Sequence, residues 1–494
     1  MKILNASYSS VETTDVYLTE ALLAFPEIKK HLIRAVCDEK NFCLINKVLG
    51  YGRAITESDL KNNDKMFIAA NHIDWAVMPR MRVPFTVTDT PDGTGVNFTD
   101  ITFHFAEGWG APGMVLMFQD GQGGFTNIIL TSAGVAESGG YAYTGKLQTY
   151  DAAATFDAGL SPVGRKVGWI TVVSASCADT TTNTPIVYPA WYRNYNTIMR
   201  PSLDVCRSGI QQVTWIEGQE GTRCWLPEEE YQFFVQFLKD FELAGWYGKR
   251  TTTADGAIGV TDQNDLQIQT GDGVLQQVQN GNTIQYDLTL YTDPANYADF
   301  QSFLEDQIVN WSIENNLTDG YELDVWAGIK AFSLLQHVLI QFVEQGRCCL
   351  MRDFANSDDS SEVEVGINIK RYMFSGFILN LRKCAIFNDP GVQGYMAPGT
   401  SYPLEAYKFI IMPDTTCDGT PLIQVYFRGG CGIEQAFMHK YRPGTVDPLN
   451  PNNPYNMTNK DGFETQYLSE YVFIVNDPQK ILVFNGYWNG GSPF

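Results

Sequence analysis

Histidine is scarce in this sequence, and the spacings that would let histidine do chemistry are missing. No two histidines stand at a spacing typical of metal ligands. His337 lies among Leu334, Leu335 and Val338, which favours a histidine with structural partners on or under a helix. The sequence therefore predicts no histidine-based metal or catalytic centre from its five histidines, which are His31, His72, His104, His337 and His439.

Loops that bind phosphate or metal ions are also missing. The run 248–251 (GKRT) has no upstream glycine, and Arg250 stands where a P-loop needs Ser or Thr. The glycines of residues 120–125 lie between strand-like runs with no helix after them, which predicts a turn. We therefore expect no catalytic, cofactor-binding or metal-binding residues and no enzyme activity. An acidic segment misses the calcium-hand spacing and is typical of a solvated surface; it contains Asp353, Asp358, Asp359, Glu362 and Glu364.

Cysteine is present, but it is not arranged for disulfides or for zinc. The cysteines are scattered, mostly among apolar neighbours, in a chain far larger than a disulfide-stapled scaffold. No Cys-x-x-Cys pair occurs, and adjacent Cys348 and Cys349 are poorly placed to bind one zinc ion. We expect reduced, packed thiols at Cys37, Cys43, Cys177, Cys206, Cys224, Cys348, Cys349, Cys384, Cys417 and Cys431.

Positive charge and long apolar runs are both in short supply. Lys and Arg number 34 against 56 Asp and Glu, a net charge of −22, which disfavours strong nucleic-acid binding because basic side chains supply that affinity. No stretch has the apolar length needed to span a bilayer, and residues 1–10 lack the apolar core of a secretory signal. We therefore expect the chain to fold and work in a cytoplasm.

Helices are the clearest local features that are present. Residues 227–244 start at Pro227, carry three glutamates in the first turn, and are expected to end at Gly245. Phe234 and Phe241 share one face of this helix, which predicts that the face is core. We also expect helical structure within 10–36 and from about 327 to 345. A further helix opens at 292–294 and is expected to bury Tyr297, Phe300, Leu304, Ile308 and Trp311.

Strands dominate two other parts of the chain. From about 82 to 225, short alternating runs separated by Gly, Asp and Pro predict an inserted all-β domain with its own core. The C-terminal part has strand-like segments at 372–381, 407–412, 423–427 and 471–475, and the whole order is an α+β pattern. In the β-rich region the aromatic residues either fill the core, which we favour for any single one, or face neighbouring molecules: Trp109, Tyr141, Tyr143 and Trp191.

This order of elements resembles the major capsid proteins of crAss-like tailed bacteriophages. The resemblance is carried by residues 372–390 (YMFSGFILNLRKCAIFNDP), 403–414 (PLEAYKFIIMPD) and 461–479 (DGFETQYLSEYVFIVNDPQ), and it extends upstream to residue 226. It implies the HK-97-type (Johnson) fold. The implied parts are an N-terminal arm at 1–60, an extended loop with a β-rich insertion at 61–225, and a peripheral domain at 226–346. The peripheral domain contains the spine helix (227–244) and the start of the axial domain. The axial domain and the returning strands follow at 347–480. The C-terminal tail is at 481–494.

The resemblance also implies a function. A protein of this family self-assembles into hexamers and pentamers that form an icosahedral shell around phage double-stranded DNA, in the virion, after assembly in the bacterial host cytoplasm. The implied partners are a portal, a scaffold or maturation protease, and head-decoration or fibre proteins. DNA would be near the shell only by non-specific proximity, and no membrane or cofactor is implied. We also expect no removed N-terminal propeptide, which departs from many phage capsid proteins.

Two alternative functions remain open at this point. A phage head-decoration, fibre or tail-sheath protein could account for the β-rich region alone. An acidic glycoside hydrolase could use two carboxylates in a chain rich in aromatic residues, although a secretion signal is lacking. The abundance of the chain in virions separates the three, because a shell protein dominates, a fibre is minor and a hydrolase is absent.

Overall fold

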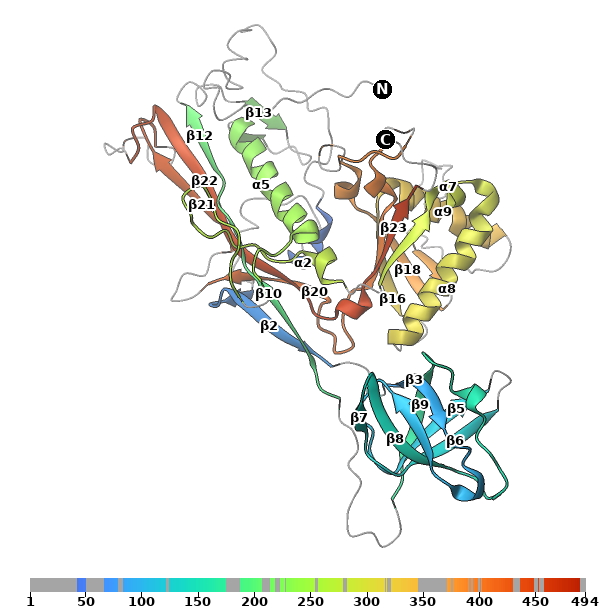
Figure 1. Ribbon diagram of the computed structural model, residues 1–494. Helices are drawn as coiled ribbons and strands as arrows, with labels where there is room; N and C mark the ends of the chain where they lie inside the picture. Colours follow the sequence, from blue (N-terminus) through green and yellow to red (C-terminus); the bar gives the residue numbers. More distant parts are fainter. Residues whose placement is uncertain are drawn as a thin grey trace. The chain divides into compact units, whose positions relative to one another are not determined.

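The computed structural model divides the chain into two compact units (Figure 1). One unit is Met1–Trp75 with Arg193–Phe494, and the other is Ala76–Tyr192. The chain passes between them through two paired strands, β2 (His72–Val77) and β10 (Ala190–Tyr195). The structure describes residues 42–49, 66–78, 83–120, 124–174, 187–206, 214–217, 223–226, 228–253, 256–278, 282–315, 317, 321–344, 371–374, 376–389, 391, 394–398, 400, 402–429, 436–447, 452 and 457–488.

The unit Ala76–Tyr192 is a closed β-barrel. Its strands are joined in the order β4 (Ile101–Phe105), β3 (Phe85–Asp92), β9 (Lys166–Val172), β5 (Met114–Gln119), β6 (Phe125–Leu130) and β8 (Gly140–Leu147). Strand β8 also pairs with β4, which closes the ring, and the short β7 (Val135–Glu137) is added to β8. Closure leaves none of the ring strands with an open edge, which removes sites for unwanted strand pairing.

The barrel encloses a core of its own, as the sequence predicts for this region. Alternation in β4 buries Ile101, Phe103 and Phe105, and the Phe103 ring stacks on Phe118 with centroids 5.3 Å apart. Tyr143 is fully buried, and its hydroxyl donates to the Glu107 carbonyl at 2.8 Å. Residues Phe85 to Val167 supply every member of this buried cluster. The barrel therefore has the hydrophobic contacts that an independent domain needs.

The β-rich unit ends earlier in the chain than residue 225. Strands β11 (Thr197–Met199) and β12 (Ser202–Cys206) pair with β22 (Gly462–Val475) in the other unit. The hairpin of β13 (Thr214–Glu217) and β14 (Arg223–Leu226) also lies in that unit. The sequence predicts that residues 188–210 return the chain to the body, but it extends the β-rich region to residue 225, because local strand patterns cannot show which sheet a strand joins.

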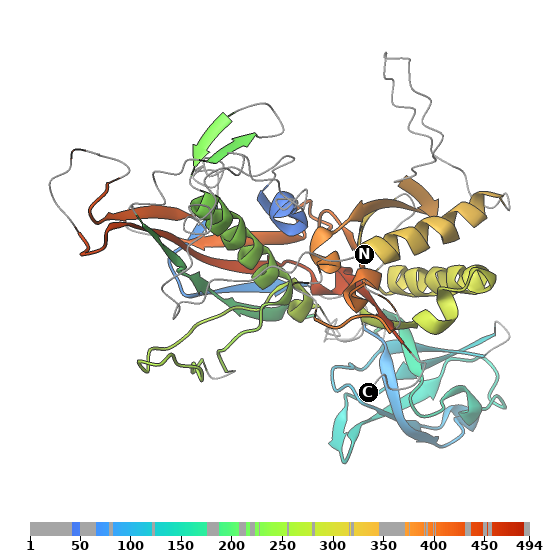
Figure 2. The same ribbon diagram turned by 90° about the horizontal axis from the view of Figure 1, so that it is seen from above.

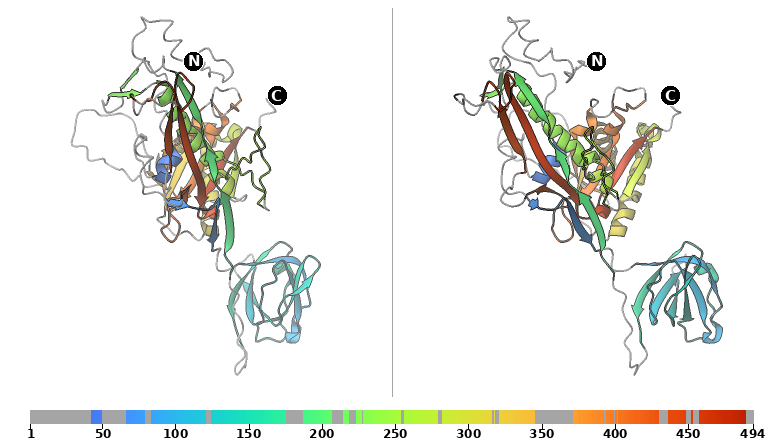
Figure 3. Two further views of the ribbon diagram at one scale, coloured as in Figure 1. Left: turned by 90° about the vertical axis from the view of Figure 1, so that its left-hand side faces the viewer. Right: turned by 60° about the vertical axis from the view of Figure 1, so that its left-hand side comes forward.

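Strand β22 is the central strand of the first sheet in the larger unit (Figure 3). Gln466 is aligned with both Ser202 of β12 and Lys440 of β21 (Met438–Pro443), so these strands flank β22 on opposite sides. Further along, Tyr471 is aligned with β11 and with β20 (Ile423–Arg428), and β1 (Met66–Ile68) runs parallel to β20. One long strand thus joins segments that are far apart in the sequence.

Helix α5 (Glu228–Tyr247) packs across this sheet. The Phe241 ring lies 4.2 Å from that of Tyr471, and the Phe237 ring stacks on Tyr467 at 5.1 Å. Phe234 and Phe241 are buried, which confirms the predicted core face, while Gln236 is exposed. Helix α5 therefore shares one hydrophobic core with β22.

The expected helix end at Gly245 is wrong. Helix α5 continues to Tyr247, and a Cβ atom at Gly245 would lie 2.6 Å from Leu44 Cδ2 and 2.9 Å from Phe473 Cζ. A side chain at this position would require Leu44 and Phe473 to move, so glycine permits their close approach to α5. A glycine that ends a helix and a glycine that permits close packing give the same signal in a sequence.

The second sheet of the larger unit has the order β15 (Thr283–Asp287), β23 (Leu482–Tyr487), β19 (Phe409–Pro413), β16 (Glu322–Ala327), β18 (Phe377–Lys383) and β17 (Arg371–Phe374). Helices α8 (Tyr297–Asn315) and α9 (Ile329–Glu344) lie side by side and share its hydrophobic core. Phe300, Leu304, Ile308 and Trp311 are buried as predicted, whereas Tyr297 is only partly buried.

The remaining elements include one further correction. The single strand predicted at 372–381 is a hairpin, β17 and β18, whose turn contains Gly376 with φ +83°. Short helices form at α2 (Cys43–Leu49), α6 (Val274–Gln277) and α7 (Leu288–Tyr291). The helix expected within 10–36 and the acidic segment 353–364 lie outside the described residues. Among the residues that are described, no helix is both long and apolar enough to cross a membrane.

Candidate assembly surfaces

The described histidines each have separate surroundings. His72 contacts the Tyr195 ring, and His104 Nδ1 lies 3.1 Å from Glu137 Oε2. His337 is exposed on α9 and stacks on Tyr297, with ring centroids 6.1 Å apart. Within the described part of the chain, no possible metal-binding group contains a histidine. His31 lies outside the described residues.

His439 instead helps to fix α5 on the first sheet. His439 Nε2 lies 2.7 Å from Thr465 Oγ1 on β22 and 3.6 Å from Glu230 Oε1 on α5. The Tyr441 hydroxyl on β21 donates to the same glutamate oxygen. Polar contacts therefore join β21, β22 and the N-terminal end of α5, in addition to the contacts of the apolar core.

Helix α2 is held by a carboxylate from α5. Glu242 Oε1 accepts from the Leu44 amide at 2.7 Å and from Trp246 Nε1 at 3.0 Å, while Oε2 accepts from the Ile45 amide at 2.8 Å. Glu242 thus caps the first turn of α2, whose amides have no partner within the helix. Burial raises the pKa of Glu242, and hydrogen bonds from the Leu44, Ile45 and Cys43 amides and from Trp246 oppose the rise.

The other end of α2 is held by ion pairs. Lys47 Nζ lies 3.1 Å from Asp324 Oδ2 and 2.8 Å from Asp414 Oδ1, and Arg382 Nε lies 3.2 Å from Asp324 Oδ1. The hydrogen bond from Lys47 holds the pKa of Asp414 below its usual value. Leu44 and Ile45 are fully buried between these two anchors. Helix α2 is therefore a firm attachment point for the part of the chain that precedes it.

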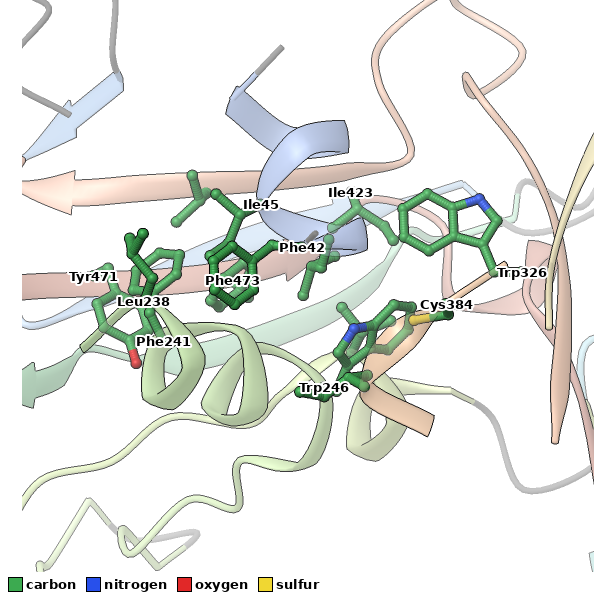
Figure 4. Close-up of a cluster of buried hydrophobic side chains, with 14 of the residues drawn as sticks. Phe42, Ile45, Leu238, Phe241, Trp246, Trp326, Cys384, Ile423, Tyr471 and Phe473 are labelled. Atoms are coloured by element: carbon green, nitrogen blue, oxygen red, sulfur yellow. The ribbon is translucent and has the colours of Figure 1, made fainter. Parts of the chain in front are cut away.

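One group of side chains was missed by the sequence analysis. Cys43, Glu242 and Cys384 place one ligand atom each within 4.8 Å of one another. Figure 4 shows Cys384 beside Trp246 in the core between α2 and α5. No spacing in the sequence signals this group, because its members come from three distant segments. Cys43, Cys384 and Cys417 carry free thiols as expected, although Cys417 is exposed and not packed.

Among the described residues, many apolar side chains are exposed, and two segments that carry some of them are candidate contact surfaces. The described segments 250–253 and 256–270 are joined by the bridges Thr252↔Ile258 and Thr261↔Gln267, and Leu266 is 65% exposed, together with Val260 and Ile268. Figure 2 shows this loop (yellow-green) projecting from the end of α5. Exposed apolar groups on an ordered projection are typical of protein contact sites.

The second surface is formed by the strand that leaves the barrel. Trp191 on β10 is 73% exposed, and the neighbouring Tyr188 is more exposed still. By contrast, Trp109 stacks on Phe85 at 4.2 Å and Tyr143 is buried, so these two aromatic residues serve the barrel core. On β2 and β10 themselves, Arg193 donates to both carboxylate oxygens of Asp74, at 2.6 and 2.7 Å, which stiffens the paired strands.

Several solved structures are similar to the chain at low identity. A protein of Microbacterium phage Oxtober96 is 9% identical over 95% of this chain and 98% of that chain, with a TM-score of 0.37. The satellite phage P4 procapsid, which includes the size determination (Sid) protein, gives 11% identity, 64% and 80% coverage, and a TM-score of 0.31. A comparison with curated proteins gave no match.

The family assignment rests only on the match of the sequence to a family model, because the TM-scores of these structures are low. The model of the family described as "Crassvirus major capsid protein" matches residues 12–484. This range covers all of the unit Ala76–Tyr192, most of the other unit, and all the C-terminal segments on which the resemblance was based. The match confirms the family expected from the sequence and the α+β capsid fold that it implied. The chain belongs to the crassvirus major capsid protein family.

Proposed function

We propose that this chain self-assembles into hexamers and pentamers, which close into an icosahedral shell around phage double-stranded DNA. The observation that carries the proposal is the match of residues 12–484 to the capsid family. The exposed apolar groups at Leu266 and Trp191 support it, because subunits that associate need such contacts. The role is structural and non-enzymatic.

Each part of the chain takes its proposed role from the family. Residues 1–60 serve as the N-terminal arm and 61–225 as the extended loop with its insertion. Helix α5 is the spine helix of the peripheral domain (226–346), residues 347–480 form the axial domain at the capsomer centre, and 481–494 form the C-terminal tail. The firm docking of α2 by Glu242 and Lys47 supports this division, since an arm that reaches a neighbour needs an anchored base.

The barrel Ala76–Tyr192 is proposed to lie on the outer face of the shell, where it contacts neighbouring subunits or decoration proteins. Its closed ring and independent core support the reading of a separate inserted module, because such a module can be added without disturbing the rest of the fold. Exposed Trp191 and Tyr188 are candidates for the contacts.

The proposed partners are a portal at one vertex, a scaffold or maturation protease during assembly, and head-decoration or fibre proteins outside. Assembly takes place in the bacterial host cytoplasm, and the chain ends in the virion. The net charge of −22 supports enclosure of DNA without tight binding, since an acidic chain and DNA carry charge of the same sign.

Assembly of the purified chain tests the proposal. We expect the wild-type protein to form capsomers or shells by sedimentation and negative-stain microscopy, and to release no sugar from glycans. Leu266→Asp is expected to reduce assembly while the circular dichroism spectrum is unchanged, and Asn264→Asp, on the same exposed loop, is the matched control. A wild-type protein that stays monomeric at all concentrations, or that hydrolyses glycans, contradicts the proposal.

A further inference from the structure

Cys43, Glu242 and Cys384 converge at the junction of three segments. Cys43 is the first residue of α2, Glu242 lies near the C-terminal end of α5, and Cys384 directly follows β18. Their sulfur and carboxylate oxygen atoms all lie within 4.8 Å of one another. Glu242 and Cys384 have no exposed surface, and Cys43 is partly buried.

The surroundings of this group are apolar. The Trp246 ring lies 5.7 Å from that of Trp326 and 5.5 Å from that of Phe387, and all three side chains are almost fully buried in the same core as Cys384. Lys47 lies on the same helix as Leu44 and Ile45, whose amides donate to Glu242. The ammonium group of Lys47 already forms ion pairs with Asp324 and Asp414. Two thiols and a carboxyl group here can become charged together only if a cation accompanies them.

The ligand types select the cation. Thiolate sulfur is a soft ligand that binds Zn²⁺ well, and Zn²⁺ also accepts a carboxylate oxygen. Mg²⁺ and Ca²⁺ prefer oxygen ligands throughout, so two sulfurs out of three disfavour them. Zinc is therefore the ion that this set of donors fits best.

The distances also fit zinc. With bonds of about 2.3 Å to sulfur and about 2.1 Å to oxygen, the ligand atoms of a tetrahedral site lie roughly 3.5 to 3.8 Å apart. The 4.8 Å limit on this group is compatible with such a site after a small closure. The Cys43 thiol donates a hydrogen bond to the Lys383 carbonyl oxygen at 3.4 Å, so this oxygen is a further oxygen atom beside Cys43.

Both oxygens of the Glu242 carboxylate accept hydrogen bonds, so a bound ion would share one of them with an amide. Oε1 accepts from both Leu44 and Trp246, whereas Oε2 accepts from the Ile45 amide. The Cys43 amide also faces this carboxylate, and it is the donor that a bound ion would replace. The hydrogen bonds that remain orient the ligand, as outer hydrogen bonds do in other metal sites.

We propose that Cys43, Cys384 and Glu242 bind one Zn²⁺ ion, with the Lys383 carbonyl oxygen or a water at the fourth position. On binding, the two thiols and the Glu242 carboxyl group release their protons to solvent and coordinate as two thiolates and a carboxylate, and no electron is transferred. The ion joins the base of the N-terminal segment to α5 and to the end of β18. This inference is independent of the proposed function, because a chain without zinc could still form shells.

Metal analysis of the full-length protein tests the site. The chain, dialysed against Zn²⁺ and then against metal-free buffer, is expected to retain about one Zn²⁺ per subunit. Cys43→Ser and Cys384→Ser are expected to weaken binding, measured by competition with a chelator, by at least about 100-fold, since even loss of a ligand's hydrogen-bonding partner costs about 10 to 100-fold. Cys417→Ser, which removes an exposed thiol elsewhere, is the matched control and is expected to bind like the wild type.

A second measurement on the wild-type protein keeps the test valid if a variant fails to fold. The partly buried Cys43 is expected to resist a thiol reagent in the zinc-loaded protein and to react after a chelator is added, as identified by mass spectrometry of labelled peptides. Wild-type protein without bound Zn²⁺ overturns the proposal. So does zinc retained in both serine variants, or a disulfide between Cys43 and Cys384 in freshly purified protein.

Discussion

Glu242 of α5 accepts a hydrogen bond from the backbone amide of Leu44, 2.7 Å away at the start of α2. The same carboxylate accepts from the Ile45 amide and from the Trp246 indole. A single buried side chain thus caps a helix that lies about two hundred positions earlier in the sequence, and it positions the base of the N-terminal segment.

Replacing Glu242 by alanine tests the importance of this cap. Glu242→Ala leaves two buried amides and one indole without their acceptor, and each such group costs about 1 to 3 kcal/mol. We expect the free energy of unfolding in urea to fall by about 3 kcal/mol or more, and trypsin to cleave near Lys47 sooner. Glu314→Ala, at an exposed position on α8, is the control and is expected to change stability by less than about 0.5 kcal/mol. Equal effects of the two substitutions would contradict the capping role.

The protonation of Glu242 should also make the free energy of unfolding depend on pH. Burial raises the pKa of Glu242, so the folded protein keeps this proton to a higher pH than the unfolded chain does. The stability that this proton contributes is complete below the unfolded pKa and is lost as the pH rises through the folded pKa.

Glu242→Gln removes this titration. In the zinc-free protein, we therefore expect the free energy of unfolding of the wild type, minus that of the variant, to fall as the pH rises above the unfolded pKa of about 4.3. The slope is at most about 1.4 kcal/mol per pH unit for one proton. Urea unfolding of both proteins in the same buffers measures it, and a difference that is flat or that rises with pH would show that the pKa is not raised.

Phe241 should dominate the contact of α5 with the sheet. Its ring is 1% exposed and packs on both Tyr471 and Phe473. Phe241→Ala is expected to cost about 3 to 5 kcal/mol and to reduce the soluble yield, as for other large aromatic residues removed from cores. Gln236→Ala on the exposed face is expected to be nearly silent. Similar losses at both positions, measured by thermal unfolding, would mean that the buried face of α5 is assigned wrongly.

A side chain at Gly245 should displace the side chains packed against it. A Cβ atom there would meet Leu44 and Phe473 at less than 3.0 Å, and overpacking of a core typically costs about 1 to 3 kcal/mol. Gly245→Val is expected to lower the melting temperature and to loosen α2, seen as faster hydrogen exchange at Leu44. Gly168→Val, on an exposed barrel strand with no neighbour within 4 Å, is the control. A stable Gly245→Val protein would contradict the close packing.

Local patterns predicted much of the fold, and long-range contacts account for what they missed. The repeat of Phe234, Phe237 and Phe241 predicted the buried face of α5, and the alternation of residues 101–105 predicted the inward side of a strand. Closure of the barrel through β4 and β8, and the pairing of β22 with β11 and β12, depend on tertiary contacts that leave no local signal.

The same reasoning applies to the sites. Absence of a catalytic motif is visible in a sequence, because such motifs have fixed spacings. Cys43, Glu242 and Cys384 have no fixed spacing, since only the docking of α2 on α5 brings them together. Leu266 could not be identified as exposed from its residue type, because a leucine is usually buried.

Electron cryomicroscopy of particles formed by the purified chain tests the central claim most directly. The account predicts closed icosahedral shells built from hexamers and pentamers, with density for the barrel Ala76–Tyr192 on the outer surface. Particles without closed symmetry, or a chain that remains monomeric at high concentration, would contradict the claim that this protein builds a capsid.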